Sequence, residues 1–341
     1  MATCFAGLMC HAPIVVPEVG EARAMECART TRAMSEVASR AILSRPDRLV
    51  LVSPHSPRHR QSYAAWPGRH VGDLGDFRAP QLRVDLPDAP EVAEFLGLPA
   101  IDLEATSARH GRQWLDHGAM VPLVFLWRAG WRGPTAILAL PWVTDAPGED
   151  LGRALAGLQG RTAVIASGDM SHRLIPGAPA GFDPQAAAFD RAFIRALRAD
   201  DWRGAMAAEP RERAAEDVVE STRVAMGAAG EPLNAEVLSY EGPWGVGYGE
   251  AILYDPQPPL YAVARSAVRA AVRGETWGMP PDSPDSAGVF VTLWKKGELR
   301  GCIGHIEPFH ELLYEEIGAC ARASSQSAGM MRPVGFEGVD T

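Results

Sequence analysis

The sequence predicts an α/β fold in which helices cover a mostly parallel β-sheet. Short, nearly unbroken apolar runs alternate along the chain with longer segments of helical composition, which is typical of strands buried between helices. Each apolar run has the length of one strand. The predicted strands are residues 3–10, 48–53, 134–140, 162–167, 235–240 and 250–254.

The segments between these strands favour helices. Residues 21–43 are rich in Ala, Arg, Glu and Met, most of which are good helix formers. Further helices are predicted at 150–158, 185–197 and 214–227. Residues 61–109 hold clusters of Pro, Gly and Asp and are predicted to be mostly loop, with a short strand at 82–86. Loop-rich segments of this kind often wall a site.

A second domain is predicted after the sequence DPQPP at 255–259. The prolines break the preceding pattern, and 341 residues are enough for two domains. Beyond the break, a helix at 260–273 and short strands at 288–294 and 298–303 indicate an α+β segment. The predicted domains span 1–255 and 258–341.

The composition argues against nucleic acid and membrane as partners. Lysine and arginine total 33 and the acidic residues total 42, so the formal net charge is −9, which disfavours binding to a phosphate backbone. No apolar stretch approaches the roughly 18 residues of a membrane span. The N-terminal residues lack the basic region of a signal peptide. The five cysteines form no CxxC pair, which favours reduced thiols and a cytoplasmic protein.

Three histidines follow predicted strands. His11 follows the first strand, His55 follows the second, and His172 follows the strand at 162–167. In an open α/β sheet, ligands bind beyond the carboxyl ends of the parallel strands. One histidine in such a place is more often a hydrogen-bonded loop residue, but three at equivalent places favour a shared site. His117, in the sequence WLDHGAMVP, is a fourth candidate for this pocket.

The predicted pocket has the residue types of a metal site. Two imidazoles with one carboxylate leave open coordination positions, and this ligand set suits Fe(II) chemistry with oxygen. The candidate carboxylates are Glu216, Asp217 and Glu220 in AAEDVVES, and Asp169. Acidic residues also suit the first turn of a helix, so spacing does not choose among them. Nitrogen and oxygen ligands also suit Zn²⁺ and Cu²⁺, which are the alternative metals, and a zinc hydrolase is a weaker alternative activity.

Four short motifs follow one another along the first domain. They are HAP at 11–13, SPH at 53–55, DHG at 116–118 and SGDMSH at 167–172. Together with SYEGPWGVGYGEA at 239–251, this ordered set resembles the class III extradiol dioxygenases of the LigB type over about residues 1–255. The resemblance implies a LigB-like or Memo-like fold. It also implies an oxidoreductase that opens a catecholic or related aromatic substrate with O₂ and Fe(II).

The same resemblance implies which residues hold the metal. By this carry-over, His11 and His55 are two of the ligands. Glu216 is the expected third ligand, because it lies eleven residues before Gly227 in a segment that resembles the ligand helix of the family.

Three further residues are assigned catalytic roles by this resemblance. His172 is similar to the acid/base histidine, and the unperturbed pKa of a histidine, roughly 6.5, suits both directions of proton transfer. His117 is similar to the histidine that stabilises bound oxygen or a developing oxyanion. Asp116 is expected to orient His117.

The second domain resembles a different family. LRGCIG at 299–304 is similar to the signature of the AMMECR-type domain, and the helix at 260–273 and the segment 311–327 fit as well. The resemblance covers about 258–341, which corresponds to part of that family's domain. Cys302 within the signature is predicted to be a buried or close-packed thiol in a Gly-flanked turn rather than a nucleophile.

The combination of the two domains implies further alternatives. It is similar to a gene system that joins Memo, AMMECR and radical-SAM proteins. One alternative is therefore a Memo-like metal-dependent redox protein in a protein-modification system. Another is a metal-binding adaptor that recruits a radical-SAM partner. Related enzymes often assemble as dimers, so a homodimer is a further expectation.

Overall fold

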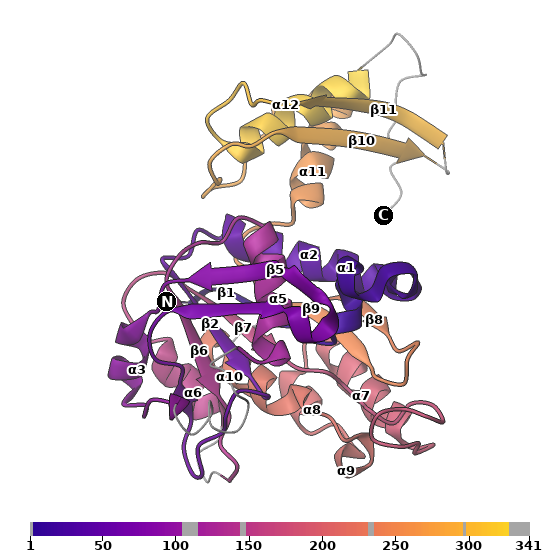
Figure 1. The fold of residues 1–341 in the computed structure, drawn as a ribbon. Coiled ribbons are helices and arrows are strands. Elements are labelled where there is room, and N and C mark those ends of the chain that lie inside the picture. Colours follow the sequence, from indigo (N-terminus) through magenta and orange to yellow (C-terminus); the bar gives the residue numbers. More distant parts are fainter. Residues whose placement is uncertain (1–2, 104–114, 144–147, 231–234, 296–297, 327–341) are drawn as a thin grey trace. The chain divides into compact units, whose positions relative to one another are not determined.

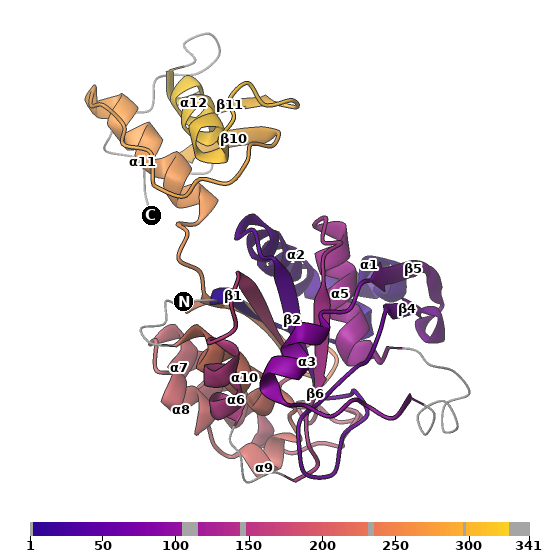
Figure 2. The same ribbon diagram turned by 90° about the vertical axis from the view of Figure 1, so that its left-hand side faces the viewer.

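The chain divides into two compact units, Met1–Asp255 and Pro256–Thr341. The computed structural model describes residues 3–103, 115–143, 148–230, 235–295 and 298–326 (Figures 1 and 2). Each unit has its own strands and helices. Among the residues so described, no helix is both long and apolar enough to cross a membrane.

The described part of the first unit is centred on a seven-stranded sheet of order β3-β6-β2-β7-β1-β9-β8. The strands are β1 (Thr3–Met9), β2 (Arg48–Ser53), β3 (Ala64–Ala65), β6 (Thr135–Ala139), β7 (Thr162–Ser167), β8 (Glu236–Glu241) and β9 (Tyr248–Tyr254). The inner strands β6, β2, β7 and β1 run parallel, whereas β3, β9 and β8 pair antiparallel at the two edges. The predicted α/β class with a mostly parallel sheet is therefore confirmed.

Successive side chains of each inner strand point to opposite faces of the sheet. Leu49 and Leu51 of β2 lie in one apolar core, and Val50 and Val52 lie in the other. The first core is closed by α2 (Ala28–Leu43) and α5 (His117–Arg128), and the second by α6 (Gly148–Leu155), α7 (Ala186–Arg198) and α10 (Val218–Ala229). Figure 2 shows helices on both sides of the sheet. Burial of both faces explains why these strands are apolar throughout.

The segment 61–109 is more regular than the sequence predicts. β4 (His70–Leu74) and β5 (Ala79–Leu86) form an antiparallel hairpin, and α3 (Pro90–Leu96) follows it. Gly72 and Asp73 lie inside β4. These residue types are depleted in strands, and they obscure the alternation of apolar and polar residues that would predict β4. Further short helices of this unit are α1 (Pro17–Gly20), α8 (Trp202–Met206) and α9 (Arg211–Ala214).

The helix predicted at 214–227 is broken near its start. Helix α9 ends at Ala214, and α10 begins only at Val218. Between them Ala215 has a φ of 52°, in the left-handed region, which cannot continue a right-handed helix. Glu216 and Asp217 therefore lie in the break rather than on the helix.

The second unit is a small α+β arrangement in its described residues. Strands β10 (Val289–Lys295) and β11 (Glu298–His305) form an antiparallel hairpin, accompanied by α11 (Leu260–Arg273) and α12 (Leu313–Gln326). Cys302 on β11 is exposed, so its predicted burial is wrong. The neighbouring Gly301 faces α12 instead, since a Cβ there would lie 2.2 Å from the carbonyl oxygen of Ser324.

Candidate metal centre

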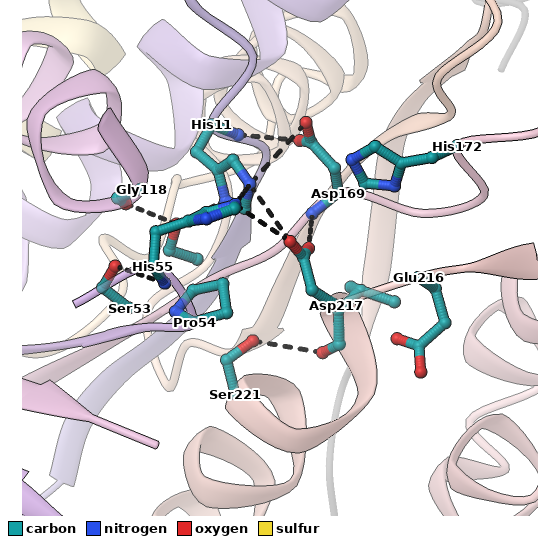
Figure 3. Close-up of polar contacts among 12 residues, drawn as sticks. His11, Ser53, Pro54, His55, Gly118, Asp169, His172, Glu216, Asp217 and Ser221 are labelled. Carbon is teal, nitrogen blue, oxygen red and sulfur yellow. Dashed lines mark hydrogen bonds and ion pairs between the residues drawn. The ribbon is translucent and has the colours of Figure 1, made fainter. Parts of the chain in front are cut away.

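Parallel strands on either side of β7 bring two histidines to the same edge of the sheet. Strands β2, β7 and β1 are neighbours, and His55 and His11 follow the ends of β2 and β1. Nε2 of His11 lies 3.0 Å from Nε2 of His55 (Figure 3). His11 is buried, whereas the side chain of His55 is 36% exposed, so the pair is reachable from solvent.

The carboxylate of Asp217 completes a triangle with these two nitrogens. Its Oδ2 lies 3.1 Å from Nε2 of His55 and 3.4 Å from Nε2 of His11. Ligands about 2.1 Å from one ion lie about 3.0 Å apart at a right angle and about 3.4 Å apart at the tetrahedral angle. The three atoms thus have the spacing of ligands to a common ion. Two imidazoles and one carboxylate suit a divalent transition metal.

Hydrogen bonds fix which nitrogen of His11 faces this triangle. The hydroxyl of Ser167 donates to the carbonyl oxygen of Gly118 at 2.6 Å, which uses its one proton. Ser167 Oγ therefore accepts the bond from Nδ1 of His11, at 3.0 Å. The proton of a neutral His11 ring is held on Nδ1, and Nε2 presents a lone pair, as outer hydrogen bonds arrange for metal-binding histidines.

Two carboxylates make the pocket favourable for a cation. Asp169 accepts the backbone N–H of His11 at 2.9 Å, and its Oδ2 lies 3.8 Å from Nε2 of His11. Burial alone would lower the pKa of His11, but Asp169 and Asp217 raise it to about 9. Burial alone would raise the pKa of Asp217, but His11 and His55 hold it well below its usual range. A proton or a metal ion is stabilised at this point.

Glu216, the predicted third ligand, does not join the two imidazoles. One of its carboxylate oxygens is bound by the guanidinium of Arg211, and the other accepts the backbone N–H of Val219 at 2.8 Å. Figure 3 shows this carboxylate turned away from the histidines. Asp217, one of the alternatives in the sequence, lies where Glu216 was predicted. The break at Ala215 is the reason, because consecutive residues outside the helix point in different directions.

His117 lies beside the triangle. Its ring centroid is 4.3 Å from that of His55 and 5.5 Å from that of His11. The potential ligand atoms of the three histidines all lie within 4.8 Å of one another. Burial, aided by the other two imidazoles, lowers the pKa of His117 to about 4. His117 is therefore neutral near pH 7.

The Asp116 carboxylate accepts hydrogen bonds from the backbone at the start of α5, where His117 lies, and from serines on both sides of His55. Its carboxylate caps α5 by accepting the N–H of Ala119 at 3.0 Å. It also accepts the hydroxyls of Ser53 and Ser56, both at 2.7 Å. Because Ser53 and Ser56 flank His55 in the sequence, Asp116 ties the loop after β2 to the start of α5. The structure shows these contacts of Asp116 with Ala119, Ser53 and Ser56, and its orientation of His117 stays a prediction.

His172 lies in the loop after β7, beside Asp169 (Figure 3). Its Nδ1 lies 3.1 Å from the carbonyl oxygen of Met170, which can only accept, so Nδ1 carries a proton. Nε2 of the neutral ring is then free to act as a base. The loop is anchored by the N–H of Ser171, which donates to buried Asp190 at 2.9 Å.

The supporting residues were not identified in the sequence. Ser167 holds His11, and Ser53 and Ser56 hold the Asp116 carboxylate. The available signal was their proximity in sequence to the candidate histidines, in LVSPHSP and SGDMSH. Outer partners of this kind orient the ligands of a metal site.

Comparison with known families gives a match for each of the two units. Residues 6–250 match the family model described as the catalytic LigB subunit of aromatic ring-opening dioxygenase. The chain belongs to this family. Residues 261–337 match the AMMECR1 family model. Both resemblances noted in the sequence are thereby confirmed.

Individual relatives extend these matches. Protein CA_C1420 of Clostridium acetobutylicum is 29% identical over 358 residues, which cover 91% of this chain and 76% of that protein. A protein of Methanothermobacter thermautotrophicus is 44% identical over 71 residues, which cover 19% of this chain and 37% of that protein. Among solved structures, uncharacterized protein JW3007 from Escherichia coli K12 has a TM-score of 0.45 and 18% identity, over 73% of this chain and 98% of that one.

Proposed function

We propose that this chain is an Fe(II)-dependent, extradiol-type dioxygenase that opens a catecholic or related aromatic ring with O₂. The observation that carries the proposal is the triangle of His11, His55 and Asp217, whose donor atoms are 3.0, 3.1 and 3.4 Å apart. Such a ligand set leaves coordination positions for other molecules and suits non-haem iron. Membership of the LigB family supports the same reaction class.

In this proposal His11, His55 and Asp217 hold the ion, and Ser167 keeps Nε2 of His11 directed at it. Fe(II) held there supplies redox chemistry and a template for the aromatic substrate and O₂. The side of the site where His55 is exposed gives these molecules access.

Proton transfer is assigned to His172. Because its Nδ1–H donates to Met170, the lone pair on Nε2 accepts a proton from a phenolic hydroxyl of the substrate. The same nitrogen returns a proton as the ring opens. A positioned acid/base group of this kind typically contributes about 10²–10⁴-fold in rate.

His117 is assigned as a hydrogen-bond donor to an oxygen on which negative charge develops. A neutral imidazole can donate one N–H without adding a second positive charge beside the cation. The lowered pKa of His117, about 4, keeps it in that form near neutral pH. A preorganised donor in a site of this type is typically worth about 3 kcal/mol.

The test is an aerobic assay of the full-length protein after anaerobic loading with Fe(II). With a panel of catechols, we expect O₂ consumption together with the yellow colour of a ring-opened product. The His172→Phe variant should retain iron and lose turnover by about 10²–10⁴-fold. His11→Ala should lose stoichiometric iron. Wild-type protein that binds no iron, or full activity in His172→Phe, would contradict these assignments.

A second candidate function rests on the AMMECR1 match at residues 261–337. In this alternative the chain is a Memo-like metal protein or adaptor that works with a radical-SAM partner rather than on a catechol. Co-purification with such a partner, in the absence of ring cleavage by the iron-loaded protein, would favour it. Ring cleavage with ordinary turnover would favour the dioxygenase.

A further inference from the structure

A second group of metal-binding side chains lies in the second unit, built from residues that the proposed active site does not use. His305 is the last residue of β11, and Glu316 and Cys320 belong to α12. Residues four apart on a helix project from the same face, so Glu316 and Cys320 are neighbours. The potential ligand atoms of the three residues all lie within 4.8 Å of one another.

Sγ of Cys320 lies at the distances from the other two ligand atoms that are expected when all three bind one ion. Sγ of Cys320 lies 3.7 Å from Nδ1 of His305 and 3.9 Å from Oε1 of Glu316. Nitrogen or oxygen at about 2.1 Å and sulfur at about 2.3 Å from a tetrahedral ion lie about 3.6 Å apart. Nδ1 of His305 and Oε1 of Glu316 meet in a hydrogen bond. An ion would take the place of that shared proton.

Glu316 is already oriented as a ligand. Its side chain is fully buried. Its Oε2 accepts the backbone N–H groups of Phe309 and His310, both at 3.0 Å, and Nδ1–H of His310 at 2.7 Å. These bonds fix the carboxylate and leave Oε1 on the side of His305 and Cys320. Outer hydrogen bonds that hold a ligating group in place are typical of metal sites.

The position of Cys320 separates this cluster from a simple buried ion pair. A carboxylate bonded to two imidazoles is satisfied without sulfur, and a buried thiol ordinarily packs among apolar groups. Here the buried Sγ instead lies near a ring nitrogen and a carboxylate oxygen. The side chains of His305 and His310 are 30% and 31% exposed, so an ion can enter from solvent.

We propose that His305, Glu316 and Cys320 bind a transition-metal ion of the Zn²⁺ class, with His310 holding the carboxylate. A thiolate, an imidazole and a carboxylate suit such an ion better than Mg²⁺ or Ca²⁺, which take oxygen ligands. On binding, the Cys320 thiol releases its proton to solvent, and His305 moves its ring proton from Nδ1 to Nε2. The proposal does not depend on the dioxygenase activity.

The test is an anaerobic titration of the full-length chain with Co²⁺. A cobalt ion bound by a thiolate has a sulfur-to-metal charge-transfer absorption, which the nitrogen and oxygen atoms of His11, His55 and Asp217 cannot produce. We expect this absorption in the wild type and its loss on addition of Zn²⁺. Cys320→Ser should abolish it, and the matched control Cys302→Ser, which alters an exposed cysteine on β11, should retain it.

Further variants keep the test decisive. His305→Gln retains the thiol and should weaken Co²⁺ binding by at least about tenfold. If circular dichroism shows that Cys320→Ser has lost helix, the Co²⁺ affinity of His305→Gln tests the proposed site instead. The His11→Ala protein should keep the absorption, which separates this site from the proposed active site. The proposal is overturned by a wild type without the absorption, by its survival in Cys320→Ser, or by unchanged affinity in His305→Gln.

Discussion

Two adjacent carboxylates in the break between α9 and α10 have opposite surroundings. Glu216 is neutralised by Arg211 and also caps α10 through the N–H of Val219. Asp217 faces two imidazoles and in addition accepts the backbone N–H of Asp169 at 2.7 Å. One of the pair is therefore structural and the other is available to a cation, although the sequence presents them side by side.

This difference predicts opposite effects of two conservative substitutions. Asp217→Asn removes the negative charge from the triangle and should lower iron affinity by more than the 10- to 100-fold typical for loss of an outer partner. Glu216→Gln should leave iron content near that of the wild type, since its carboxylate does not face the imidazoles. Iron bound after anaerobic desalting measures both. Equal retention of iron by the two variants would contradict the assignment of Asp217.

Asp190 is a buried acid that supports the loop carrying His172. It accepts the N–H of Ser171 at 2.9 Å and the hydroxyl of Tyr240 at 2.7 Å. Burial raises the pKa of Asp190 to about 6. Its pKa in the unfolded chain is about 3.9, so the folded protein binds this proton more tightly. The resulting stabilisation is fully present below about pH 4 and is lost as the pH rises to about 6.

Asp190→Asn should therefore flatten the pH dependence of stability. The amide keeps the shape and an acceptor for Ser171 but does not titrate in this range. From pH 4 to pH 7 the wild type should lose about 2–3 kcal/mol of unfolding free energy through Asp190, and the variant should not show this loss. Denaturant titrations at several pH values measure this difference. Parallel curves for the two proteins would show that Asp190 titrates normally in the folded state.

Close approach between β7 and α10 sets the position of Asp217. Gly168 follows β7, and a Cβ there would lie 2.4 Å from Cα of Val218, the first residue of α10. Backbone atoms cannot yield as a flexible side chain can, so a side chain at this position must displace the start of the helix. The glycine is thus required for α10 to bring Asp217 to the histidines.

Gly168→Ala should consequently damage the metal site more than the fold. Overpacking of this kind typically costs about 1–3 kcal/mol, which a domain of this size can tolerate. The shift of α10 should lower iron affinity at least about tenfold. The matched control is Gly278→Ala, where an added Cβ meets nothing within 4 Å. Iron titration with circular dichroism would refute the argument if both variants bound iron like the wild type.

The elements that the sequence could predict are those with the simplest environments. Strands β1, β2, β6 and β7 are buried on both faces, so they are apolar throughout and easily recognised. The meeting of His11 and His55 could be predicted because each follows a parallel strand, and the carboxyl ends of parallel strands lie at the same edge of the sheet. Hairpin β4–β5 was mostly missed, because Gly72 and Asp73 interrupt its pattern.

The remaining differences depend on single backbone positions. The choice between Glu216 and Asp217 is decided by the left-handed Ala215, and an alanine gives no signal of positive φ. The burial of Cys302 was predicted wrongly because strand register places Gly301, rather than the cysteine, against α12. A one-residue shift in a strand exchanges its two faces, and this shift cannot be read from composition.

An ion at the proposed site would join distant parts of the first unit. His11 and His55 are separated by 44 residues, and Asp217 lies far beyond both in the sequence. These positions meet only in the folded chain, since they belong to the ends of two strands and the start of a helix. An ion with this ligand set therefore binds the native state and stabilises it by mass action.

Metal removal should accordingly lower the melting temperature of the first unit. At a free Fe(II) concentration of 100 times Kd the stabilisation is about 2.7 kcal/mol. For a domain of about 250 residues, this corresponds to a Tm roughly 5–10 °C above that of the chelator-treated protein. Anaerobic calorimetry measures the shift, which should vanish in Asp217→Asn and persist in Cys320→Ser, where only the second unit is altered. An undiminished shift in Asp217→Asn would mean that the stabilising ion binds elsewhere.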